Sequence, residues 1–130
     1  MTNPNTQALQ LAQAIGACRR AAIAGGNGIR VLEVEALLLI AGGCDAIGDI
    51  NAATGGSRAN TARSLRFLSG RDAPIGRSSG SGGGGTRVSP FRLIEYRKHP
   101  HRRGHQYRLS GEGYALLAPC LQIQKLPDWS

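Results

Sequence analysis

The chain has 130 residues, of which 41% are hydrophobic and only 5% aromatic, with 16 Lys and Arg against eight Asp and Glu. This length fits one small domain and leaves little room for a separate catalytic domain, and the shortage of aromatic residues predicts a modest aliphatic core that suits packed helices. The longest apolar run, 36–43, falls short of the roughly 20 residues that cross a bilayer, and no signal-peptide pattern opens the chain. We therefore expect a cytoplasmic protein without membrane attachment.

Apolar residues at three- and four-residue spacing predict a first helix from Thr6 to about Ala24, closed by Gly25 and Gly26. The apolar stripe of this helix is expected to comprise Ala8, Leu11, Ala12, Ile15, Cys18 and Ala22. After a turn at Asn27 and Gly28, a second, largely buried helix is predicted over Val31 to Ala41, with positions 31, 34, 37, 38 and 41 apolar.

Two short helices joined by a glycine turn predict a helix-turn-helix. Asp45 is expected to cap the first, over Ala46 to Thr54, whose inward residues are Ile47, Ile50 and Ala53. After Gly55 and Gly56, Ser57 is expected to cap the second, which runs to about Leu68. This helix packs Leu65 and Leu68, with Thr61 or Ala62. It turns outward or to its flanks Arg58, Asn60, Arg63 and Arg66.

Turn-forming residues from Gly70 to Pro90 predict a loop, with SSGSGGGG at 78–85 as its centre. The sequence GGGGTR lacks the Lys followed by Ser or Thr of a P-loop, so we do not expect nucleotide binding there. A native loop and an engineered flexible linker both remain open readings of this octet.

Two strand-like segments, 91–97 and 105–109, flank the basic stretch KHPHRRG and predict a β-hairpin with a basic tip at about 98–104. Ser110 is expected to cap a short helix from Gly111 to about Ala118, which ends before Pro119. In the tail, Leu121, Ile123 and Leu126 are expected to pack back on the domain.

The charge is concentrated in the same part of the chain. Between Arg58 and Arg108, twelve Lys and Arg face only Asp72 and Glu95, so this window carries +10 and the remainder −2. Fourteen of the sixteen basic residues are Arg, whose planar donors match phosphate groups and guanine edges. Nucleic acid is the expected partner, and a basic face that serves only solubility is the alternative.

The helix-turn-helix, hairpin and following helix share residues with a known pattern. Within 47–68 these are Ile47, Ile50, Gly55, Ser57, Arg63 and Leu68, and after the hairpin tip they are Arg102 or Arg103, Leu109, Ser110, Gly113 and Leu116. With these residues the chain from Val31 to Ala118 resembles the MarR family of bacterial transcription regulators. The resemblance implies a winged helix-turn-helix, mainly α with a small β-hairpin wing. The C-terminal helices that form the family's ligand pocket are too short here, so a small-molecule effector is not supported.

From the charge and the resemblance we expect a sequence-specific regulator of double-stranded DNA, acting as a repressor. The helix at about 57–69 would read the major groove and the wing tip at about 98–104 the minor groove. The candidate DNA-binding residues are Ser57, Arg58, Asn60, Thr61, Arg63, Arg66, Arg92, Arg97, Lys98, Arg102, Arg103 and Arg108. The alternatives are an accessory protein of replication, partition or recombination that recruits other proteins, and a protein or RNA interaction module. The small Arg-rich chain suggests a mobile element such as a phage or plasmid.

We expect neither an enzyme nor a cofactor, because the eight acids are scattered and form no catalytic pair. We also expect no metal site: His99, His101 and His105 are interpreted as solvated wing residues. Cys18, Cys44 and Cys120 contain no Cys-x-x-Cys pair, which argues against a disulfide framework and a zinc knuckle. A redox-sensing thiol at Cys18, activated by Arg19 and Arg20, is the alternative to small buried cysteines.

The expected organisation is an N-terminal helix at 1–28, the DNA-binding domain at 29–118 and a tail at 119–130. A single winged helix reads few base pairs, so we expect a homodimer on a palindromic site, paired mainly through the first helix. The tail, with Trp129, could complete that interface.

Overall fold

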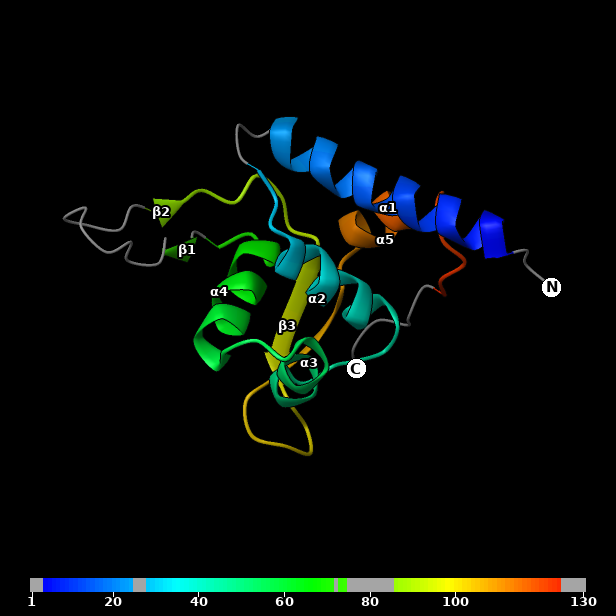
Figure 1. The fold of residues 1–130 in the computed structure, drawn as a ribbon. Helices are drawn as coiled ribbons and strands as arrows, with labels where there is room; N and C mark the ends of the chain where they lie inside the picture. The colour runs from blue at the N-terminus through cyan, green and yellow to red at the C-terminus, as the bar shows by residue number, and fades with distance from the viewer. Residues whose placement is uncertain (1–3, 25–27, 72, 75–85, 125–130) are drawn as a thin grey trace.

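The computed structural model describes residues 4–24, 28–71, 73–74 and 86–124. Over these residues the fold is mainly α, with an antiparallel hairpin that follows the helix-turn-helix (Figure 1). The elements are α1 (Pro4–Ala24), α2 (Val31–Ala41), α3 (Ile47–Thr54), α4 (Arg58–Leu68), β1 (Ala73–Pro74), β2 (Thr86–Arg87), β3 (Ile94–Lys98), β4 (His105–Leu109) and α5 (Gly111–Leu117). The predicted fold class, a winged helix-turn-helix, is thereby confirmed.

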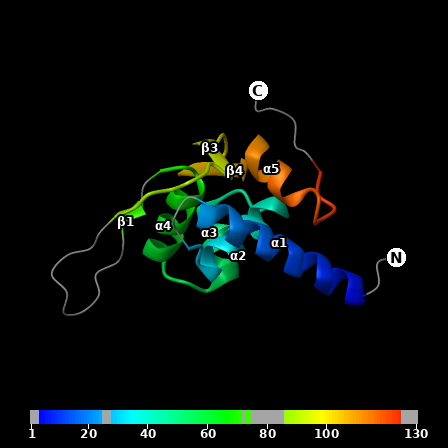
Figure 2. The same cartoon turned by 90° about the horizontal axis from the view of Figure 1, so that it is seen from above.

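Helix α1 lies across the body beside α5, and its first turns extend past the rest of the molecule (Figures 1 and 2). Ala14, Cys18 and Ala22 are buried in the core, whereas Leu11 and Ile15 are exposed. The predicted stripe is therefore buried over only part of its length. Its C-terminal half packs on the core, and its N-terminal half has no cover because the helix extends beyond the body.

Helix α2 has the predicted bounds but a different buried face. Val34, Leu37 and Ile40 are in the core, as the three-residue spacing indicates, but Val31 is 85% exposed. Glu33, a charged residue, is 1% exposed instead. Its carboxylate accepts from the Arg30 backbone N–H at 2.8 Å and from both terminal nitrogens of Arg87, so the buried charge is paired.

The first helix of the helix-turn-helix begins without the predicted cap. The residue before α3 is Ala46, which makes no side-chain cap, and the Asp45 carboxylate accepts instead from Gln106 of β4 at 2.9 Å. Ile50 is fully buried, but Ala53, predicted to point inward, is exposed. Asp45 thus holds the hairpin rather than capping α3.

The turn between α3 and α4 depends on a glycine and an asparagine. Gly55 ends α3 at φ 72°, a conformation that costs other residues energy because of their Cβ. The Asn51 amide donates to the carbonyl oxygens of Gly56 at 3.0 Å and Ser57 at 3.1 Å. Ser57 caps α4 as predicted, accepting from the Asn60 N–H at 3.1 Å.

The hairpin pairs Ile94 with Leu109 and Lys98 with His105. The strand begins at Ile94 rather than at residue 91, because the preceding residues bond elsewhere: the Leu93 N–H donates to the Leu68 carbonyl at 2.8 Å. Ser110 caps α5 as predicted, accepting from the Gly113 N–H at 3.0 Å.

Most of the predicted 70–90 loop, including the Gly/Ser octet, lies outside the described residues, as do Gly25, Gly26, Leu126 and Trp129. The described ends of the loop, β1 and β2, pair antiparallel. Leu121 and Ile123 pack partly buried against the core, as predicted for the tail. Among the helices of the described residues, none combines the length and apolarity that crossing a membrane requires.

Gly113 lies where α5 meets the chain before β3. A Cβ at this position would lie 2.0 Å from the Leu93 carbonyl oxygen, a backbone atom that the hairpin holds in place. We predict that Gly113→Ala lowers the free energy of unfolding by about 3 kcal/mol, measured by urea denaturation. Gly111→Ala in the same helix is the control, because its Cβ would meet nothing within 4 Å. Equal midpoints for the two variants would show that α5 does not pack as described.

Candidate nucleic-acid interface

The outward face of α4 combines arginines with small residues. Arg58, Asn60 and Arg66 are exposed and Arg63 is half-buried, as the sequence predicts. Ala59 and Ala62 are exposed between them. Small side chains let a helix approach a surface closely, so this face can bring guanidinium groups near a partner without steric obstruction.

Two of the candidate residues, Thr61 on α4 and Ser57 at its N-cap, make hydrogen bonds within the fold. Thr61 is 1% exposed, and its hydroxyl bonds to the Ser57 carbonyl at 3.1 Å and to Asn51. It therefore fastens α4 to α3 and does not face solvent. The hydroxyl of Ser57 is occupied by the helix cap, although the residue itself is exposed.

The wing turn, residues 99–104, carries a second group of cations beside Lys98. Lys98, Arg102 and Arg103 are exposed. Arg102 donates to Asp49 of α3 at 2.6 Å, and this hydrogen bond and its charge hold the pKa of Asp49 below its usual range. Asp49 is therefore ionised at neutral pH, and acid removes its charge, and with it the attraction to Arg102, only below the usual carboxylate range.

The prediction that all three histidines are solvated is wrong for His99. This residue is 8% exposed, its Nε2 lies 3.5 Å from an oxygen of Asp45, and its Nδ1 accepts from the His101 N–H at 3.1 Å. His101 and His105 are exposed. In the part of the chain that the structure describes, no three His, Cys, Asp or Glu side chains come together as a metal site would need.

The candidate arginines on the two strands, Arg97 and Arg108, make contacts across the hairpin on one of its faces. The register places Arg108 opposite Glu95, and the two form an ion pair with Nε and Oε1 2.5 Å apart. Tyr96 and Tyr107 pair on the other face. Arg97 also bonds across the strands, to Gln106 at 2.8 Å, while Arg92 is exposed before β3. Arg108 is thus part of the hairpin's own structure.

Three arginines near α4 were not among the predicted site residues. Arg71 lies 4.3 Å over the Tyr96 ring, Arg87 lies 3.9 Å over the Phe67 ring, and Arg30 precedes α2. The basic window contains Arg71 and Arg87, so composition could have included them. Arg30 lies outside that window, and only the packing of α2 on α4 brings it close.

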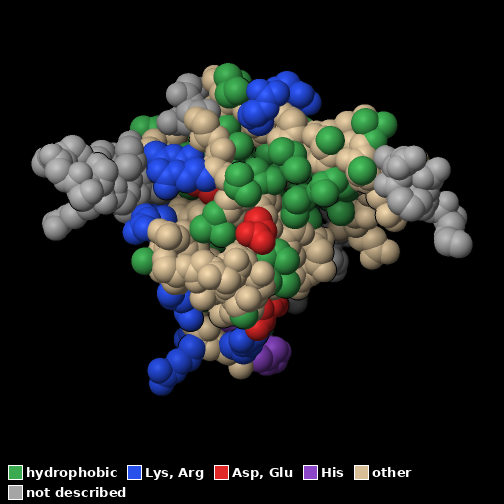
Figure 3. Space-filling model, viewed as in Figure 1, with side chains coloured by type: hydrophobic (Ala, Val, Ile, Leu, Met, Phe, Trp, Pro, Cys, Tyr) green, Lys and Arg blue, Asp and Glu red, His purple; other side chains and the backbone are tan. Residues whose placement is uncertain are grey.

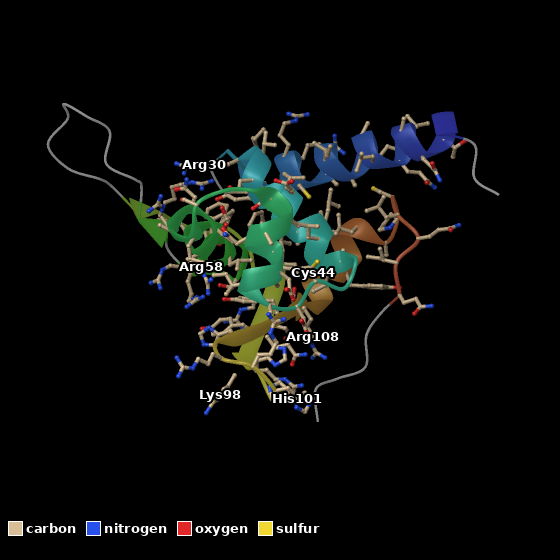
Figure 4. The ribbon with its side chains drawn as sticks, turned by 60° about the horizontal axis from the view of Figure 1, so that its bottom comes forward. Arg30, Cys44, Arg58, Lys98, His101 and Arg108 are labelled. Carbon is tan, nitrogen blue, oxygen red and sulfur yellow. The ribbon has the colours of Figure 1, made fainter. Side chains whose placement is uncertain are left out.

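We use the name basic edge for seven exposed or half-buried cations that precede α2, lie on α4 or belong to the wing: Arg30, Arg58, Arg63, Arg66, Lys98, Arg102 and Arg103. In Figure 4, Arg58 lies between Arg30 and Lys98 along one side of the molecule. Figure 3 shows Lys and Arg side chains down that side, whereas hydrophobic side chains gather over α1 and α2.

Cys18 does not have the environment of a reactive thiol. It is fully buried, and burial raises its pKa to about 11. The alternative of a thiol activated by Arg19 and Arg20 is therefore wrong, because both arginines are exposed and desolvation outweighs them.

No model of a known protein family matches the chain, and a search of curated proteins gives no significant match. Function is therefore argued from the chemistry of the basic edge.

Proposed function

We propose that the protein is a sequence-specific, double-stranded DNA-binding regulator of the winged helix-turn-helix type, similar to MarR regulators, and that it acts as a repressor. The observation that carries this proposal is that Arg58 of α4 and Lys98, the residue that enters the wing turn, lie along one side of the molecule (Figure 4). A helix in a major groove and a wing at the adjacent minor groove require this alignment.

The roles of individual residues follow from their exposure. Arg58 and Arg66 extend from α4 and are suited to guanine edges and phosphates, while Ala59 and Ala62 can meet thymine methyl groups. Asn60 accepts a hydrogen bond from Arg63, so the two act as one unit on the flank of α4. Ser57 contributes through the geometry of the helix start rather than through its hydroxyl.

The wing turn supplies the minor-groove contact. Arg103 is exposed, and no hydrogen bond or ion pair within the described residues engages its side chain. Arg102 would exchange Asp49 for the DNA, a small cost because both partners of that pair are about half exposed. Lys98 and Arg92 are suited to holding phosphates.

We also propose a non-catalytic role. Among the described acids, Glu33, Asp49 and Glu95 each pair with an arginine, and Asp45 bonds to Gln106. This distribution supports structural work by the acids rather than acid-base chemistry.

A homodimer paired through the overhanging half of α1 is part of the proposal. None of residues 6–13 is buried, and two large apolar side chains of this segment face solvent: Leu9 is 58% exposed and Leu11 is 45% exposed. This apolar surface lies away from the basic edge, so two copies can meet there without bringing their strongest positive charges together.

We predict that Leu11→Glu with Ile15→Glu yields a folded monomer, because both side chains are already 42–45% exposed. Sedimentation at micromolar concentration would measure the change in mass, and circular dichroism would check the fold. A wild-type protein that is already monomeric and still gives a two-fold footprint would exclude this interface.

The DNA proposal is tested with a site selected from random duplexes by the wild-type protein. We predict that Arg58→Ala weakens binding to the selected site by about 1–3 kcal/mol but changes binding to random DNA much less, because it reads bases. Lys98→Ala should weaken both equally, because a phosphate contact carries no sequence. Arg19→Ala on α1 is the control, because it removes the same charge as Arg58→Ala. It should change neither binding to the selected site nor binding to random DNA. Equal losses on both DNAs for Arg58→Ala would contradict the reading role of α4.

A further inference from the structure

A hollow separates the start of α2 from the flank of α4. Its polar lining comes from three elements: Arg30 and Glu33 at the start of α2, Asn60, Arg63 and Ser64 of α4, and Arg87 of β2. These residues are distant in sequence, and the packing of α2 on α4 brings them together. The hollow has a volume of about 160 Å³.

The charges in this hollow are unequal. Arg87 and Glu33 satisfy each other, because Arg87 donates to both carboxylate oxygens and also to the Gly28 carbonyl at 2.7 Å. Their side chains are only 10% and 1% exposed, so they form a fixed floor. Arg30 and Arg63 remain as an excess of two positive charges.

Neither of these two arginines is neutralised by an acid within the described part of the chain. Arg63 donates to the Asn60 amide oxygen, which carries no charge. For Arg30, the described residues supply no hydrogen bond or ion pair to the guanidinium, although its backbone N–H bonds to Glu33. Guanidinium groups on two walls of a concave site are suited to a small oxyanion.

The size and position of the hollow narrow the choice of anion. Since water takes about 30 Å³ per molecule in the liquid, 160 Å³ holds a phosphate group with a few waters but not a base pair or a peptide helix. Arg30 and the wing lie on opposite sides of Arg58 (Figure 4). A duplex that contacts α4 would present one backbone to the wing and another toward the hollow.

We propose that this hollow is a phosphate-binding site, and that its occupant in the complex is a DNA backbone phosphate beyond the reach of the wing. The second part rests on the proposed function. Arg30, already part of the basic edge, thereby becomes a direct phosphate contact, and Arg87 is added to the interface as the fixed floor of the site.

The free-anion test uses inorganic pyrophosphate and no DNA. Titration of wild-type protein should shift the Arg87 Nε–H resonance in a nitrogen-correlated NMR spectrum to saturation. The double variant Arg30→Gln, Arg63→Gln should need at least about fivefold more pyrophosphate for the same shift. The matched double variant Arg19→Gln, Arg20→Gln removes the same charge from α1 and should titrate like wild type. Equal weakening in both double variants would mean general charge attraction and would overturn the site.

The DNA test measures how the affinity of Arg30 and Arg19 variants for a duplex depends on salt concentration. Arg30→Gln should reduce the slope of log K against log salt by about 1, the loss of one phosphate contact, and Arg19→Gln should leave it unchanged. If pyrophosphate binds as predicted but Arg30→Gln leaves the slope unchanged, the site holds a free phosphate compound and the DNA assignment is wrong. If the wild-type protein binds no duplex, the proposed function fails, while the pyrophosphate result still decides whether the hollow binds phosphate.

Discussion

The buried ion pair between Glu33 and Arg87 is the contact on which the placement of the hairpin depends. A buried carboxylate without a partner costs several kcal/mol, so Glu33 requires Arg87 to be in place. Arg87 in turn lies over the Phe67 ring, and Ser89 just after it donates to the Phe67 carbonyl at 2.6 Å. The chain that enters the hairpin is therefore fixed against both α2 and α4.

A second set of contacts fixes the far end of the hairpin. The acids of the α3 region hold it: Asp45 accepts from Gln106, and Asp49 accepts from Arg102. Because both ends of the hairpin are fixed, the wing turn and the outward face of α4 keep the same position and orientation relative to each other. Preorganised cations lose little conformational entropy on binding, which favours a rigid interface for a rigid duplex. Of these two acids, Asp49 pairs with one cation of the wing turn, Arg102.

Local signals explain which elements the sequence could predict. Ser57 and Ser110 each precede a helix and accept from an N–H three residues later, a pattern that needs no tertiary information. The bounds of α2 follow equally from its apolar run. The residues whose contacts could not be predicted bond to partners that are distant in the sequence. Asp45 reads locally as a cap but bonds to Gln106, and the burial of Glu33 has no local signal because it depends on Arg87, 54 residues away.

The same distinction between local signals and contacts with distant residues applies to the candidate site. The outward arginines of α4 could be predicted from helical spacing, because α4 is amphipathic. Helical spacing left Thr61 or Ala62 as the packed residue, and the contact between α3 and α4 selects Thr61. Burial of His99 could not be predicted, because it depends on how the wing packs against Asp45. The contribution of Arg30 was missed for the same reason: it lies 28 residues before Arg58, outside the basic window.

The central claim is that the basic edge as a whole binds the phosphates of a DNA duplex, and the dependence of affinity on salt measures this most directly. Each phosphate contact contributes about −0.9 to the slope of log K against log salt, so six to eight contacts predict a slope of about −5 to −7. A slope shallower than about −2 would contradict an extended interface and leave α4 and the wing without a common partner.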